Sequence, residues 1–107
     1  MIKITFFKDS DDICRGFSST GHAGYGINGE DIVCSAVSVL TINTVNSIEK
    51  FTTDKFNANM EDGLLTFSFI DKNISHESQL LTNSLILGIE GIAHDYRKYI
   101  QIIFKEV

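Results

Sequence analysis

The chain has 107 residues, a net charge of −5 and 43% hydrophobic residues. This length predicts a single domain spanning residues 1–107, and the apolar content excludes a disordered chain. The negative charge argues against non-specific nucleic-acid binding, which needs a basic surface. It fits a basic partner or substrate, and it also fits an ordinary, mildly acidic soluble protein.

The first eight residues alternate in polarity and are too short for a signal peptide, and no uninterrupted apolar run approaches a membrane span. We therefore expect a cytoplasmic protein that does not contact membranes. In that compartment Cys14 and Cys34 should be reduced thiols. The CxxC and His-x-x-x-His spacings of zinc sites are missing, so we expect neither a metal nor another cofactor.

The first half of the chain predicts a β-hairpin followed by a helix. Residues 2–8 alternate apolar and polar side chains, residues 9–12 have turn composition, and residues 13–22 suit a second strand. Residues 24–30 form a predicted loop that contains the turn signal Asn28-Gly29. Asp31 is then the expected N-cap of a helix running from Ile32 to about Phe51.

The second half repeats this order. Residues 54–61 and 64–71 flank Asp62-Gly63, a typical hairpin turn. Asn73 or Ser75 is the expected cap of a helix of about twenty residues. Gly88 and Gly91 weaken that helix, which predicts that another element packs closely against them. A last strand covers residues 99–106.

The predicted order is therefore ββαββαβ, which indicates an α+β two-layer sandwich. We expect a mostly antiparallel or mixed sheet with both helices on one face. The other face still carries Phe7 and Ile103. A chain this small is expected to cover that face by forming a homodimer.

The stretch from His22 to Cys34 carries the chemistry. A thiol in the first turn of a helix lies beside unpaired backbone N–H groups, whose partial positive charge stabilises a thiolate. An imidazole brought close by the intervening loop would complete a nucleophile–base pair. The Cys34 N–H would then be a donor for the oxyanion of an acyl-transfer intermediate. The alternative is that Cys34 is a small packing residue, which is common for free cysteines.

The residues around this pair have several possible roles. Asp31 either caps the helix, orients His22, or disfavours the thiolate by its negative charge. Ser38 lies one turn beyond Cys34, where it either bonds near the site or bonds back to a helix carbonyl. Gly24, Tyr25, Gly26 and Gly29 form a pliable loop suited to close on a substrate. The same glycines match a dinucleotide pattern, but no βαβ unit surrounds them and two acidic residues follow.

Two segments resemble the signature of a known family. Gly-His-Ala-Gly-Tyr at residues 21–25 and Gly-Glu-Asp-Ile-Val-Cys-Ser-Ala-Val-Ser at residues 29–38 are similar to the ribosomal-processing cysteine protease family (Prp). Chain length and element order agree over essentially the whole chain. The resemblance implies a catalytic dyad of His22 and Cys34. It also implies a homodimer that removes the short N-terminal extension of a bacterial large-subunit ribosomal protein.

Two other functions remain open on the residues alone. The first is a non-catalytic, ribosome-associated module that grips a peptide without cutting it. The second is a redox or thiol-transfer role for Cys34, which has no CxxC partner.

Overall fold

The computed structural model describes residues 1–21 and 28–107, and for residues 28–31 the backbone alone. Its elements follow the predicted order: β1 (Ile2–Lys8), β2 (Cys14–Thr20), α1 (Asn28–Phe51), β3 (Phe56–Glu61), β4 (Leu64–Phe69), α2 (His76–Asp95) and β5 (Ile100–Glu106). The predicted ββαββαβ order is confirmed.

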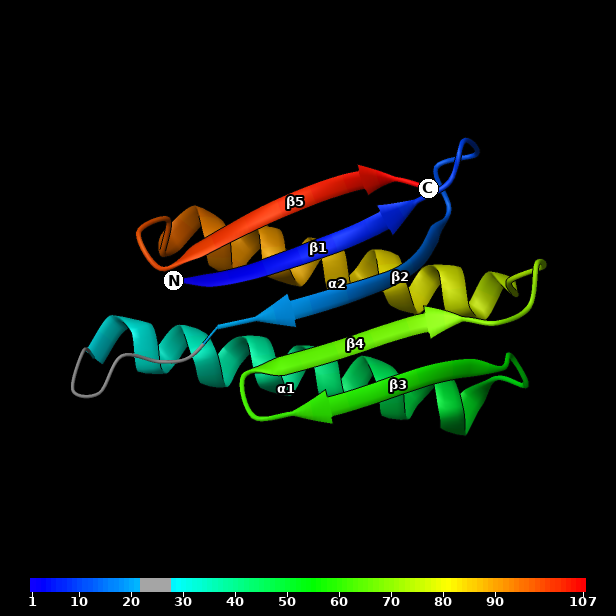
Figure 1. Ribbon diagram of the computed structural model, residues 1–107, viewed down its shortest axis with the longest axis horizontal. Helices are drawn as coiled ribbons and strands as arrows, with labels where there is room; N and C mark the ends of the chain where they lie inside the picture. The colour runs from blue at the N-terminus through cyan, green and yellow to red at the C-terminus, as the bar shows by residue number, and fades with distance from the viewer. Residues whose placement is uncertain (22–27) are drawn as a thin grey trace.

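The five strands form one mixed sheet in the order β3-β4-β2-β1-β5 (Figure 1). The β1–β2, β2–β4 and β3–β4 pairs are antiparallel, whereas β1 and β5 run parallel. Two parallel strands must be joined by a long crossover connection. Here the chain from β2 through α2 connects β1 to β5. Strands β3 and β5 are the two edges.

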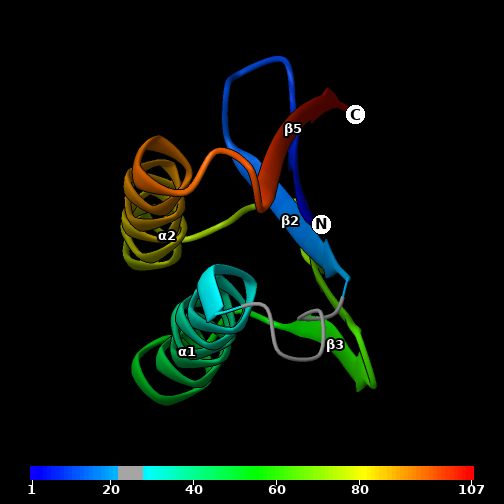
Figure 2. The same cartoon turned by 90° about the vertical axis from the view of Figure 1, so that its left-hand side faces the viewer.

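Both helices cover the same face of the sheet, which confirms the two-layer α+β sandwich (Figure 2). The strand residues on this face follow the alternation that the sequence predicts, so Ile2, Ile4 and Phe6 of β1 are almost completely buried. The rings of Phe17 and Phe67 stack on neighbouring strands with their centroids 4.9 Å apart. Burial of these side chains supplies the main driving force for folding.

Helix α1 contributes Val33, Val37 and Ile48 to this core. Its stretch Ile32–Phe51 is long and apolar enough to cross a membrane by length and composition alone. A core helix of a globular domain meets the same criterion, and the burial of these three side chains against the sheet layer shows α1 acting as one.

Helix α2 has the N-cap that the sequence predicts. The Ser75 hydroxyl accepts a hydrogen bond from the Ser78 amide, which satisfies one of the free donors of the first turn. Close packing is confirmed at Gly88, where a Cβ would lie 3.1 Å from Leu40 Cδ1 of α1. The same expectation is wrong at Gly91, because nothing lies within 4 Å of its Cβ position.

Candidate active site

The beginning of α1 corrects two predictions. The helix starts at Asn28, so Asp31 is its fourth residue and not its N-cap, and Gly29 belongs to the helix and not to the loop. The Asn-Gly pair is a strong turn signal in isolation, but here both residues continue the helix. His22, Gly24, Tyr25 and Gly26 lie outside the described residues.

This longer helix also changes the expected electrostatics of Cys34. Cys34 is the seventh residue of α1 and lies in the second turn. Only the first four N–H groups of a helix lack an intrahelical partner, and the dipole effect decays within the first turn. The Cys34 amide is therefore not a free oxyanion donor. The Cys34 thiol likewise lies beyond the first turn, where the helix dipole acts.

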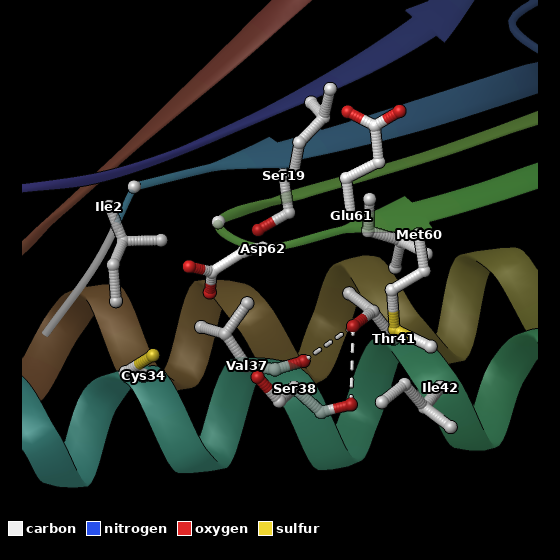
Figure 3. Close-up of a pocket in the computed structure, with 14 residues that line it drawn as sticks. Ile2, Ser19, Cys34, Val37, Ser38, Thr41, Ile42, Met60, Glu61 and Asp62 are labelled. Atoms are coloured by element: carbon white, nitrogen blue, oxygen red, sulfur yellow. Dashed lines mark hydrogen bonds between the residues drawn. The ribbon is translucent and has the colours of Figure 1, made fainter.

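The Cys34 thiol is free and half-buried, and it lies in the wall of a cavity of about 210 Å³. Figure 3 shows its sulfur on the side of α1 that faces the strands, below Ile2. Gly21, which directly precedes His22 in the sequence, lines the same cavity. The structure thus opens a cavity beside the predicted nucleophile.

Three parts of the fold build this cavity. One wall is α1, the second is the β3–β4 hairpin, and the third consists of the ends of β1 and β2. The Gly21 amide donates to the Gly63 carbonyl at 3.0 Å, which ties the end of β2 to the hairpin turn. Gly63 has φ +75°, a conformation that favours glycine and that makes this tight turn possible.

Two acidic residues of the hairpin, Glu61 and Asp62, line the cavity, and no basic residue does so among the described residues. Figure 3 shows the Asp62 carboxylate pointing toward the space above α1, whereas the Glu61 carboxylate points away from it. The charged residues that line the described part of the cavity are therefore both acidic.

Ser38 lines the cavity together with Cys34, as their spacing on the helix predicts. Its hydroxyl has no hydrogen-bond partner among the described side chains and carbonyls, so the bond back to the helix that we considered is not made. Thr41 makes such bonds instead: its Oγ1 donates to the carbonyls of Val37 (2.8 Å) and Ser38 (3.2 Å). The Ser38 hydroxyl is left available at the cavity wall.

Sequence reasoning missed most of the cavity. Thr41 follows Cys34 by seven positions and so shares its helix face, which helical periodicity could have shown. The hairpin and strand residues give no such signal, because only the tertiary fold brings them to α1. They are Ile2, Ser19, Met60, Glu61, Asp62 and Leu65.

The second cysteine is a packing residue. Cys14 is buried, and its Sγ donates to the Gly16 carbonyl at 3.3 Å. Burial raises the pKa of the Cys14 thiol above its ordinary value, which disfavours the reactive thiolate. His94 forms an exposed pair with Asp95 at 3.2 Å, far from either cysteine in the sequence.

A free thiol in the wall of a cavity suits a cysteine hydrolase, and comparison with known proteins shows that the class is cysteine protease. The chain belongs to the family of the cysteine protease Prp, whose family model matches residues 1–101. It is 26% identical to the ribosomal processing cysteine protease Prp of Bacillus subtilis, over 95% of this chain and 96% of that protein.

Two solved structures of the ribosomal processing protease Prp from S. aureus share this fold. The complex with a substrate peptide has a TM-score of 0.90 at 25% identity, and the complex with a covalently linked product peptide has a TM-score of 0.88 at 26% identity. Each comparison covers 98% of this chain and 100% of the other. The predicted family, fold and enzyme class are therefore confirmed.

Proposed function

We propose that this chain removes the short N-terminal extension of a bacterial large-subunit ribosomal protein, with Cys34 as the nucleophile. The observation that carries the proposal is the half-buried Cys34 thiol in the wall of a cavity, in a chain of the Prp family. The name of the B. subtilis relative supports a ribosomal substrate, and the covalently linked product peptide of the S. aureus relative supports covalent catalysis.

His22 is the proposed second member of the dyad. Gly21, its neighbour in the sequence, lines the cavity of Cys34, which supports this assignment. His22 accepts the proton of the Cys34 thiol, and the resulting thiolate attacks the scissile carbonyl carbon. The tetrahedral intermediate then collapses to a thioester as the leaving amine takes that proton from His22. His22 then accepts a proton from water, the hydroxide cleaves the thioester, and the carboxylate product leaves the regenerated Cys34.

The remaining predicted residues keep supporting roles in this proposal. Asp31 orients the His22 ring, since it does not cap the helix. The Ser38 hydroxyl binds the peptide at the cavity wall. Gly24, Tyr25 and Gly26 cover the bound peptide. The net charge of −5 suits a substrate segment that carries basic residues.

The test is cleavage of a synthetic peptide that spans the junction between the extension and the mature ribosomal protein. Wild type should give two products, identified by mass spectrometry. Cys34→Ala should give none, and His22→Ala should lower kcat/KM by at least about 100-fold, because general acid–base catalysis contributes that much.

Cys14→Ala and His94→Ala are the matched controls, since these residues lie outside the proposed site. Both should retain kcat/KM within about twofold, provided that thermal unfolding shows an intact fold. Cleavage by Cys34→Ala at the wild-type rate would refute the nucleophile. Binding of the peptide by wild type without any cleavage would instead support the peptide-binding module.

We also propose that the protein acts in the cytoplasm as a homodimer. The uncovered sheet face, with its half-buried Phe7 and Ile103, supports association of two copies.

A further inference from the structure

A second cavity adjoins the one that holds Cys34. It has a volume of about 180 Å³ and lies between α1 and the β3–β4 hairpin. Ile42, Met60 and Leu65 line both cavities, and Val45 of α1 and Ala58 of β3 line only the second. The two cavities therefore lie next to each other along α1, with the second farther along the helix from Cys34.

The second cavity lies between α1 and one edge of the sheet. The β3 strand is an edge of the sheet, and most of its side chains are exposed. Ala58 pairs with Phe67 of the core face, so its small side chain points toward α1 and leaves space there.

Met60 separates the two cavities. Its side chain is 62% exposed, and Figure 3 shows it reaching from the hairpin toward α1 beside Thr41 and Ile42. An unbranched methionine adapts its shape to the group beside it. No charged residue lines the second cavity among the described residues, in contrast to the first, where Glu61 and Asp62 do so.

The spacing of the cavities sets a length. Val45 follows Cys34 by eleven positions in α1, which corresponds to about 16 Å at 1.5 Å per residue. An extended peptide rises about 3.3 Å per residue and would cover this distance in about five residues. The occupant is expected to be a peptide because the second cavity adjoins the cavity of Cys34, and a relative of the same fold holds a substrate peptide.

We infer that the second cavity is a remote substrate subsite that binds an apolar side chain about five residues from the scissile bond, and that Met60 is the specificity-determining residue at its entrance. This inference rests on the proposed function of Cys34. It adds a distance requirement: an apolar anchor and the scissile bond must be correctly spaced along one extended segment.

The test combines an alanine scan of the junction peptide with a variant that fills the cavity. Ala58→Leu places a larger side chain in the second cavity. Asn57→Leu is the matched control, because Asn57 pairs with Ser68 on the opposite face of the same strand. In wild type, alanine at one apolar position about five residues from the cut should lower kcat/KM at least about tenfold.

Ala58→Leu should cleave the parent peptide at least about tenfold more slowly than wild type. Its kcat/KM should fall little further when the remote apolar residue of the peptide is replaced by alanine. Asn57→Leu should show the same fall in kcat/KM as wild type when the remote apolar position of the peptide is alanine. Met60→Ala should admit tryptophan at the position, which wild type should disfavour. Together these results would establish the subsite and the role of Met60 at its entrance.

Other outcomes overturn the inference, and they separate it from the proposed function. If wild type cleaves the peptide but no remote position matters, or if Ala58→Leu and Asn57→Leu behave alike, the subsite is wrong and the protease assignment stands. If wild type cleaves no junction peptide at all, the proposed function fails and this inference fails with it.

Discussion

At the scale of single residues, Gly88 and Gly91 show how position decides the effect of the same change. Both lie inside α2, where glycine costs about 1 kcal/mol relative to alanine. A Cβ at Gly91 would meet nothing within 4 Å, whereas one at Gly88 would lie 3.1 Å from Leu40 Cδ1. One glycine is therefore required by the contact between the helices, and the other is not.

We predict that Gly91→Ala raises the free energy of unfolding by about 1 kcal/mol. Gly88→Ala should gain less or nothing, because the Leu40 side chain must move to make room. Chemical denaturation of the two variants measures the difference directly. Equal stabilisation by both changes would show that α1 and α2 do not pack closely at Gly88.

At the scale of elements, Asp54 joins the segment after α1 to the start of α2. Its Oδ2 accepts hydrogen bonds from the Ser75 hydroxyl at 2.5 Å, from the Ser75 amide at 3.3 Å, and from the Ser78 hydroxyl. Partial burial opposes ionisation of Asp54, but the bonds from Ser75 and Ser78 outweigh it, so the pKa of this carboxyl lies below its ordinary value.

This shift predicts a pH dependence of stability. A lowered pKa in the folded state means that ionised Asp54 stabilises the fold above the unfolded value of about 3.9, and that this stabilisation is lost as the pH falls through the folded value. Asp54→Asn should lower the free energy of unfolding at pH 7 by about 1 to 2 kcal/mol. Its stability should then fall less than that of wild type between pH 5 and pH 2.

Asp11→Asn is the control, because Asp11 is an exposed residue of the turn between β1 and β2. It should follow the wild-type pH profile. Denaturant unfolding at several pH values measures all three proteins. A profile of Asp54→Asn parallel to that of wild type would show that the hydrogen bonds of Asp54 to Ser75 and Ser78 contribute nothing to the loss of stability in acid.

At the scale of the whole molecule, the face of the sheet opposite the helices determines the expected assembly. Phe7 and Ile103 are half-buried on this face, where Ile103 pairs with Thr5 of β1. Neighbouring positions on β2 and β4 are small and polar, such as Ser18, Thr66 and Ser68. The apolar part of this face is therefore narrower than the sequence suggested and lies over β1 and β5.

We predict a sedimentation-equilibrium mass of twice 11.9 kDa for the wild-type protein at micromolar concentration. Ile103→Glu should weaken association at least about tenfold, because a buried interface disfavours an unpaired charge. Leu87→Glu, at an exposed position of α2 in the other layer, should have little effect. A wild-type protein that sediments as a monomer would contradict the homodimer proposal.

Local chemistry determined much of this fold. The alternation of apolar residues predicted the strands, and the sequence from Ile32 to about Phe51 predicted most of α1. The Asp62-Gly63 pair correctly predicted the second hairpin, and Ser75 the cap of α2. These signals are readable because they depend on residues within a few positions of one another.

The tertiary structure decided what distant segments do together. It extended α1 to Asn28, which removed the predicted cap at Asp31 and moved Cys34 out of the first turn. It also brought the hairpin residues Met60 and Asp62 to the cavity of Cys34. No local pattern specifies such contacts, because they arise only when a strand pairs, a helix packs, and the space left between them takes its shape.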